Sequence, residues 1–272
     1  MRLGIGLAIA LLAVGDNAPL ERVGRLEAPE IVEASGIVQS RRFPGTFWVH
    51  NDSGNPATLF AVKRDGGLIR SYPVAAPNVD WEDIAIDDAG HLYLGDIGNN
   101  RARLPLRAIY RVDEPDPSKP ADGPLQVGLA LHYRFDEPKR FDAEGLFIDA
   151  GRATLITKRL DGQAAEVYRL ALDRPSPLLR PALPELVGTL AGCVEPATGA
   201  GLSPDGRRLA VVTDAAARVY EREGDAAWKL AATVRFDAKD VEAICWDGTD
   251  LILASEDRSI YRIAEARWRP SR

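Results

Sequence analysis

The chain has 272 residues, of which 46% are hydrophobic and 27% are charged, and its formal net charge is −6. This length and hydrophobic content exclude a disordered chain and allow a full buried core. The acidic balance excludes nucleic acid as an expected partner, because phosphate binding requires a basic face.

The first predicted element is an N-terminal signal peptide. Arg2 precedes an uninterrupted apolar run at 3–14, and small residues stand at Ala13 and Gly15. This pattern is typical of an export signal, and a buried first helix is the alternative. The run is too short to be a permanent bilayer anchor. We therefore expect a signal peptide at 1–15, a single domain at 16–272, a periplasmic or secreted location, and no membrane span after cleavage.

The rest of the chain repeats a motif in which two acids, two positions apart, precede an apolar segment. The clear copies are VDWEDIAID, FDAEGLFID and KDVEAICWD, whose first acids are Asp80, Asp142 and Asp240. We place degenerate copies at Glu33, where Ser35 replaces the second acid, and at Thr198, where Ala200 replaces it. An aromatic strand follows each copy, at Phe60, Tyr110, Tyr168, Tyr220 and Tyr261. Recurrence of both landmarks in the same order indicates a repeat architecture.

Each repeat contains segments for up to four short strands, separated by turn sequences such as DDAG and PDG. Four strands per unit of about 40–50 residues predict an all-β, five-bladed β-propeller. The last repeat has only three strands, so we expect the segment at 22–28 to complete the last blade and close the ring. A six-bladed ring is the alternative, and it would need a blade from the proline-rich segments around 115–124 or 175–184.

Propeller geometry gathers the acids at one mouth of the central channel. The first strand of each blade lines the channel, and residues two apart on a strand face the same way. The second strand runs antiparallel, so its end returns beside the start of the first. These ends carry Asn51, Asp96, Lys158, Asp214 and Glu256. We therefore expect an acidic rim, opposed by Lys158, that contains Glu33, Asp80, Glu82, Asp96, Asp142, Glu144, Asp214, Asp240, Glu242 and Glu256.

Carboxylates in a narrow mouth repel one another, and three arrangements would relieve this repulsion. They are a bound cation, protonation with raised pKa values, and salt bridges to Lys158 or to arginines. Carboxylate oxygens with an amide oxygen from Asn51 or Asn99 would suit Ca²⁺ as a cofactor. The alternative is structural, because an acid before a strand often accepts backbone hydrogen bonds that hold the turn.

Two loops at the same mouth, 48–56 and 95–103, are richer in polar residues and glycine than a turn requires, so we expect them to be functional, with a pair of Asx turns as the alternative. His50 is the histidine expected there, either as a general base or as a satisfied strand-end residue. Trp81 would stack on a sugar ring or plug the channel. The candidate ligand-binding residues are Asn51, Asp52, Trp81, Asn99 and Lys158.

The segments HNDSGN, DWEDIA, GDIGNN, AEGLFID and SPDGRR resemble exported bacterial propellers of the phytase-like, esterase-like and TolB-like group, which are also described as WD40-like. Calcium-dependent lactonases and phosphotriesterases of similar shape hold a central ion with Glu, Asp and Asn at the blade mouths. By this resemblance, the implied metal ligands are Glu33, Glu82, Asp96, Glu144 and Glu242. The chain departs from these enzymes in lacking their histidine pair and in its five expected blades rather than six.

Two functions fit these patterns. The first is an exported binding or scaffold protein whose acidic, calcium-binding mouth holds a small molecule, an ion or a periplasmic protein. The alternative is a calcium-dependent hydrolase of phosphoesters, lactones or glycosides, with His50 or Glu144 as the catalytic base. Cys193 and Cys245 would either pair in an oxidising compartment or remain buried thiols.

Overall fold

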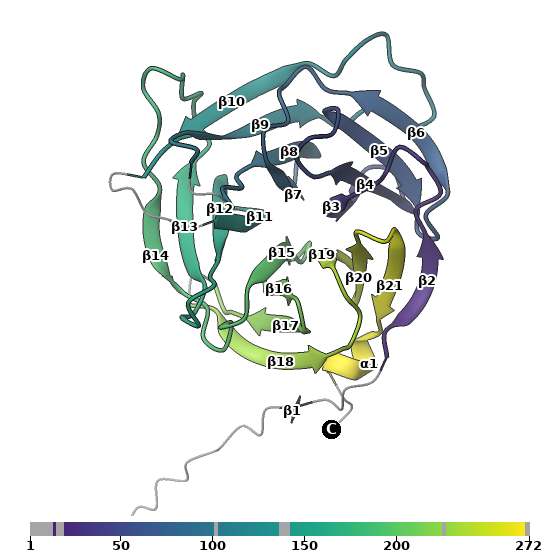
Figure 1. The fold of residues 1–272 in the computed structure, drawn as a ribbon, viewed down its shortest axis with the longest axis vertical. Helices are drawn as coiled ribbons and strands as arrows, with labels where there is room; N and C mark the ends of the chain where they lie inside the picture. The colour runs from purple at the N-terminus through teal and green to yellow at the C-terminus, as the bar shows by residue number, and fades with distance from the viewer. Residues whose placement is uncertain (1–12, 15–18, 101–102, 136–141, 225–226, 270–272) are drawn as a thin grey trace, which may run out of the picture.

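The computed structural model describes residues 13–14, 19–100, 103–135, 142–224 and 227–269. Its strands form five sheets arranged around a common axis (Figure 1). Each sheet has four antiparallel strands, and a short parallel strand, β1 (Ala13–Val14), is added to the outer edge of one of them. The predicted all-β, five-bladed propeller is therefore confirmed.

The strands of each blade follow one another from the axis outward. The first blade contains β3 (Ala34–Gln39), β4 (Thr46–Asn51), β5 (Thr58–Lys63) and β6 (Leu68–Pro73). The second contains β7 (Trp81–Ile86), β8 (His91–Asp96), β9 (Arg107–Asp113) and β10 (Val127–Tyr133). The third contains β11 (Asp142–Asp149), β12 (Arg152–Lys158), β13 (Glu166–Ala171) and β14 (Glu185–Thr189). The fourth contains β15 (Ala197–Leu202), β16 (Arg208–Thr213), β17 (Ala216–Glu221) and β18 (Lys229–Arg235).

The fifth blade joins the two ends of the ring. Its inner strands are β19 (Val241–Asp247), β20 (Asp250–Ser255) and β21 (Ser259–Ile263), and its outer strand is β2 (Glu21–Arg25). The antiparallel pairing of β2 with β21 confirms the predicted closure by an N-terminal strand. Closure of this kind ties distant parts of the chain together and leaves the ring without an open end.

The proline-rich segments form straps between blades rather than a sixth blade. Leu125 makes a parallel bridge to Val74 beside the outer strand of the first blade. Ser176 and Ala182 bridge in the same way to β10, the outer strand of the second blade. Backbone groups on exposed sheet edges are thereby paired, which reduces the tendency of an edge to aggregate.

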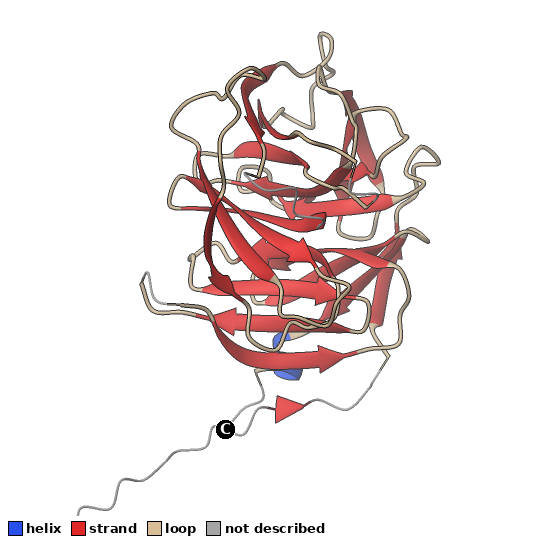
Figure 2. Cartoon of the chain, turned by 60° about the vertical axis from the view of Figure 1, so that its left-hand side comes forward, coloured by secondary structure: helices blue, strands red, loops and turns tan. Residues whose placement is uncertain are grey.

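Helix is nearly absent from the described part of the chain, where α1 (Glu265–Trp268) is the one helical element (Figure 2). Within the described ranges, the structure contains no helix with the length and apolar character needed to cross a membrane. The predicted signal peptide at 1–15 lies outside the described residues apart from β1.

The hydrophobic core is divided into wedges, one at each junction between neighbouring blades. Ile84 and Ile86 pack between the first and second blades, and Leu146 and Ile148 pack between the second and third. Packing between blades was the role predicted for these four residues. Cys193 and Cys245 are both buried and unpaired, so they do not form a disulfide.

Every innermost strand has a β-bulge near its start. The pairing register with the second strand shifts around one residue in each blade, and these residues are Ser35, Glu82, Glu144, Thr198 and Glu242. The extra residue is left out of the ladder and the strand twists locally. The register corrects the repeat assignment in the fourth blade, because Thr198 and not Ala200 occupies the position of the second acid. Sequence spacing alone could not reveal a bulge.

The residue after each bulge lies where the five inner strands converge. Four blades carry glycine or alanine at this position, and these are Gly36, Gly145, Gly199 and Ala243. The second blade carries Asp83, which is fully buried. A Cβ atom added to Gly199 would lie 2.7 Å from the backbone oxygen of Glu242, which shows how closely the strands approach.

The carboxylate of Asp83 ties three blades together at the axis. Its Oδ2 accepts hydrogen bonds from the backbone N–H of Leu146, at 2.8 Å, and of Ala200, at 3.1 Å. Its Oδ1 accepts one from the backbone N–H of Ile84, at 2.8 Å. Burial raises the pKa of Asp83 well above its ordinary value, although these backbone donors oppose the shift. Asp83 therefore links neighbouring blades where side-chain packing has no room.

We predict that Asp83→Ala lowers the free energy of unfolding by about 2–5 kcal/mol, because it removes the acceptor of three buried backbone N–H groups. Chemical unfolding by urea measures this change. The control is Asp88→Ala, whose side chain is 92% exposed, and which should change stability by less than about 0.5 kcal/mol. Equal, small effects of both substitutions would contradict the role assigned to Asp83.

Candidate cation site at the acidic mouth

The acidic mouth is built by the starts of the innermost strands and the ends of the second strands, as the repeat predicts. Asp142 lies opposite Lys158, and Trp81 lies opposite Asp96, at the paired ends of their strands. Two of the bulge residues, Glu82 and Glu144, come from neighbouring blades, and both are buried. The bulges therefore set acidic side chains into a crowded, desolvated space.

Carboxylates from different blades meet in two overlapping groups. Ligand atoms of Glu82, Asp142 and Glu144 lie within 4.8 Å of one another, and all three side chains are buried. Asp52, Asp80 and Glu82 form a second group within the same limit, in which the two aspartates are only partly buried. Glu82 belongs to both groups and connects the buried cluster to the open part of the mouth.

Two buried oxygen atoms of the first group have no hydrogen-bond partner among the described residues. They are Oε1 of Glu82 and Oδ2 of Asp142. Buried polar atoms nearly always have a hydrogen-bond partner. An unpaired buried oxygen atom therefore indicates a partner of another kind, such as an ion or a water molecule. Unpaired oxygen atoms in the same buried carboxylate group offer a set of hard ligands to a cation.

The loop after β8 holds these acids in place. The backbone N–H groups of Ile97 and Gly98 both donate to the carbonyl of Asp80, each at 3.1 Å. A Cβ atom at Gly98 would lie 2.0 Å from Oε1 of Glu82, so only glycine leaves room for that carboxylate. The backbone N–H of Asn99 donates to Oδ1 of Asp142. This arrangement explains the glycine in the segment GDIGNN.

Lys158 supplies the compensating charge inside the mouth. Its Nζ lies 2.7 Å from Oε1 of Glu144, and both side chains are mostly shielded from solvent. Burial lowers the pKa of Lys158, but the nearby carboxylates, Glu144 foremost and then Glu242 and Glu82, together outweigh this effect and raise the pKa overall. The lysine therefore stays charged and neutralises part of the acidic cluster.

The remaining negative charge is relieved by raised pKa values. Burial, followed by repulsion from Glu144, raises the pKa of Glu82 well above its ordinary value. The pKa of Glu144 is also raised well above its ordinary value, chiefly by burial and against the effect of Lys158. Burial raises the pKa values of Asp80 and Asp96 to about 6 and that of Glu242 to about 7. The mouth therefore takes up and releases protons near neutral pH.

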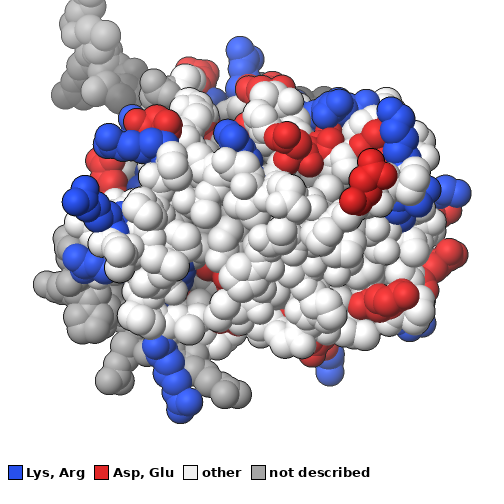
Figure 3. Space-filling model, turned by 90° about the horizontal axis from the view of Figure 1, so that it is seen from above, with Lys and Arg blue, Asp and Glu red and all other residues white. Residues whose placement is uncertain are grey.

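The outer side of the ring carries no comparable concentration of acids in the view from the top of Figure 1. There, charged side chains of both signs lie mainly toward the margins, and the middle of the face is uncharged (Figure 3). This side of the molecule is therefore not uniformly acidic.

Several predicted site residues support the mouth rather than facing it. The side-chain oxygen of Asn51 accepts hydrogen bonds from the backbone N–H groups of Val32 and Glu33. Trp81 is fully buried, and its indole N–H donates to the carbonyl of Pro77 at 2.9 Å. These two side chains are occupied in holding neighbouring loops.

Asn99 is similarly engaged, because its side-chain oxygen accepts from the backbone N–H groups of Arg103 and Leu104. His50 is fully buried beside Trp81, with ring centroids 5.5 Å apart. Its Nδ1 lies 3.0 Å from the carbonyl oxygen of Asn51. Burial lowers the pKa of His50 to about 4, so the ring is neutral at physiological pH.

The metal ligands implied by the resemblance divide into two sets. Glu82 and Glu144 lie in the buried carboxylate group, whereas Glu33, Asp96 and Glu242 belong to neither close group. Glu33 is exposed and accepts a hydrogen bond from Asn55, and Asp96 accepts one from the backbone N–H of Asp80 at 2.6 Å. The structure adds Asp142, Asp80 and Asp52 to the close groups.

The repeat pattern did not predict the roles of Asp83 and Gly98. Asp83 was visible as an acid at a position where the other copies of the motif have glycine or alanine, once the fourth copy is placed in register. Gly98 lies in a loop already recognised as polar, but its contact with Glu82 depends on how two separate segments fold together.

No family model matches the chain, and no curated protein matches it in sequence. Among solved structures, a gluconolactonase from Xanthomonas campestris is 15% identical, with a TM-score of 0.45, over 91% of this chain and 85% of the enzyme. A catalytically inactive virginiamycin B lyase from Staphylococcus aureus, crystallised with quinupristin, is 15% identical, with a TM-score of 0.43, over 87% of this chain and 67% of the lyase. At this level of similarity, neither enzyme indicates the activity of the chain.

We predict that the cation-free protein becomes less stable as the pH rises from about 5 to about 8. Asp80, Asp96 and Glu242 have folded-state pKa values of about 6, 6 and 7, above their ordinary values of 3.8, 3.8 and 4.5. The folded protein thus binds more protons than the unfolded chain in this window, and stability falls with pH. Urea unfolding in chelator at several pH values measures the trend. A rise in stability across the window would contradict the raised pKa values.

Proposed function

We propose that the acidic mouth binds a divalent cation, with Ca²⁺ as the best match, and that the bound ion holds a small oxygen-bearing ligand. The observation that carries this proposal is the pair of buried oxygen atoms on Glu82 and Asp142 that have no partner among the described residues and lie close to the carboxylate of Glu144. Ca²⁺ takes oxygen ligands in flexible geometry, and neither close group contains histidine or cysteine.

A cation would complete the charge balance of the mouth. Lys158 neutralises Glu144, but Glu82 and Asp142 have no ion-pair partner of their own among the described residues. Without a cation, protonation relieves the repulsion, and a bound cation displaces those protons because a ligating carboxylate must be ionised. Binding should therefore strengthen as the pH rises.

The open part of the mouth leaves coordination positions for a ligand. Asp52 and Asp80 are partly exposed and lie next to Glu82, so an ion held there can also contact solvent or a bound molecule. A ligand with carboxylate, phosphate or hydroxyl oxygens matches such a site.

Export to the periplasm or outside the cell, and a protein partner at the mouth, remain predictions.

We predict that Ca²⁺ at about 100 times its dissociation constant stabilises the wild-type protein by about 2.7 kcal/mol relative to chelator. This corresponds to a rise in melting temperature of roughly 5–10 °C. Glu82→Gln should abolish the rise, because it replaces the carboxylate shared by both groups with a neutral amide of similar shape. Thermal unfolding at about pH 7.5 measures both, because a ligating carboxylate must be ionised.

The matched control is Glu33→Gln, which neutralises an exposed acid of the same rim outside the close groups and should retain the full rise. A normal Ca²⁺ response in Glu82→Gln would refute the site.

Lys158→Met provides a second check, because removing the competing ammonium group should increase Ca²⁺ affinity about tenfold or more while lowering stability in chelator. Weaker Ca²⁺ binding in Lys158→Met would show that the lysine helps to form the site instead.

Hydrolysis at the cation-loaded mouth is a second candidate function, favoured by the pKa of Glu242. Burial raises this pKa to about 7, and Lys158 opposes the shift, so Glu242 exchanges a proton near neutral pH. A cation would polarise a bound ester, lactone or glycoside, and Glu242 would act as the base. The catalytic roles predicted for His50 and Glu144 remain predictions, and His50 is buried and neutral.

We predict that a hydrolase would turn over phosphoester, lactone or glycoside substrates only in the presence of Ca²⁺, and that Glu242→Gln would lower kcat about 100-fold or more. Glu33→Gln again serves as the control. Absence of turnover in Ca²⁺-loaded wild-type protein would leave cation-dependent ligand binding as the function and exclude hydrolysis of that substrate panel.

A further inference from the structure

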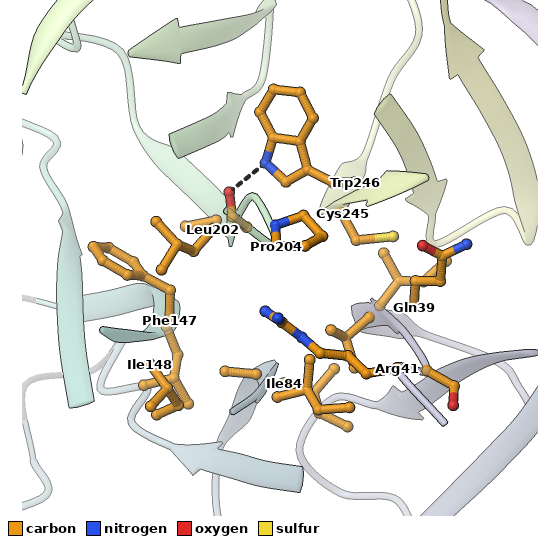
Figure 4. Close-up of a pocket in the computed structure, with 17 residues that line it drawn as sticks. Gln39, Arg41, Ile84, Phe147, Ile148, Leu202, Pro204, Cys245 and Trp246 are labelled. Carbon is orange, nitrogen blue, oxygen red and sulfur yellow. Dashed lines mark hydrogen bonds between the residues drawn. The ribbon is translucent and has the colours of Figure 1, made fainter. Parts of the chain in front are cut away.

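A second cavity opens at the other end of the central channel. It has a volume of about 380 Å³ and is lined by the later parts of all five innermost strands (Figure 4). None of its lining residues belongs to either close carboxylate group, and Asp83 binds the backbone N–H groups of three of them, Ile84, Leu146 and Ala200. The two ends of the channel are therefore distinct sites.

The walls of this cavity are mainly apolar. The apolar lining side chains include Ile86, Phe147, Ile148, Leu202 and Trp246. The polar groups of the wall are engaged elsewhere: the indole N–H of Trp246 donates to the carbonyl of Gly201 at 2.8 Å, and the amide of Gln39 donates to Asp247 at 2.6 Å. Small-molecule pockets commonly have volumes of about 300–1,000 Å³, mainly apolar walls and a few polar groups.

Arg41 is the charged side chain among the lining residues, and its guanidinium projects into the opening (Figure 4). Its Nη1 lies 2.8 Å from Oδ1 of Asp88 in the second blade. The Asp88 side chain is 92% exposed, so this ion pair contributes little to stability. A guanidinium presents a planar fork of donors that matches a carboxylate, and a ligand carboxylate can replace Asp88 at small cost.

We propose that this cavity binds a small monocarboxylate with an apolar tail. The tail occupies the space between Phe147, Ile148, Leu202 and Trp246, and the carboxylate pairs with Arg41 at the opening. Burial of the tail supplies most of the affinity, and the guanidinium selects the anionic head group over an uncharged one. This inference is independent of the function proposed for the acidic mouth.

Isothermal titration calorimetry with octanoate and octan-1-ol tests the proposal on the full chain. Chelator is present throughout, so that the acidic mouth contains no cation that could bind octanoate. We expect saturable binding of one octanoate per chain, about tenfold or more tighter than binding of octan-1-ol. Absence of saturable octanoate binding, or equal affinities for the acid and the alcohol, would overturn the proposal.

Three variants assign the binding to this cavity. Arg41→Gln should weaken octanoate binding about tenfold and leave octan-1-ol unchanged, whereas Asp88→Asn should strengthen octanoate binding, because it removes the competing carboxylate. Leu202→Trp should weaken binding of both ligands by filling the space that the apolar tail would occupy. Arg207→Gln, at an exposed arginine outside the cavity lining, is the control and should bind as wild type.

Circular dichroism and melting temperature confirm that each variant is folded. Unchanged octanoate affinity in folded Arg41→Gln, or weaker octanoate binding in Asp88→Asn, would overturn the role of the guanidinium. Binding that survives Leu202→Trp unaltered would place octanoate elsewhere on the protein.

Discussion

Convergence of five strands at one axis is the constraint on which the rest of this structure depends. Close to the axis the backbones leave room only for glycine or alanine in four blades, as at Gly145 and Gly199. Asp83 fills the remaining space and accepts backbone hydrogen bonds from the third and fourth blades. A buried carboxylate with several backbone donors can hold such a junction where hydrophobic packing has no volume to use.

The same convergence gives the channel two chemically different ends. Toward the start of the innermost strands, bulges bring Glu82 and Glu144 close to Asp142 in a buried group, two of whose oxygen atoms have no hydrogen-bond partner in the described part of the chain. Toward their ends, the strands carry apolar side chains around a cavity, and the guanidinium of Arg41 projects into its opening. Asp83 lies between these regions, because it follows Glu82 of the mouth and precedes Ile84 of the cavity on the same strand. The two proposed sites, one for a cation and one for a monocarboxylate, therefore use different residues of the same innermost strands.

The sequence was sufficient for the repeat, the blade count and the acidic rim, because these follow from periodicity, turn residues and antiparallel pairing. It was insufficient wherever a side chain had more than one available partner. Asn51 has the right chemistry for a ligand, yet its amide holds the backbone at Val32 and Glu33. His50 lies next to the predicted mouth in sequence, but its ring is buried against Trp81. The bulge at Thr198 shifts the pairing of β15 with β16 by one residue, so the spacing of the motif gave the wrong alignment for the fourth blade.

The central claim is that one cation occupies the space between Glu82, Asp142 and Glu144. A crystal structure of the Ca²⁺-loaded protein, with the ion identified from its anomalous signal, tests this most directly. The account predicts a peak with oxygen ligands from Glu82 and Asp142 at about 2.3–2.6 Å. An ordered water molecule at that position, with both carboxylates hydrogen-bonded to it in saturating Ca²⁺, would contradict the claim.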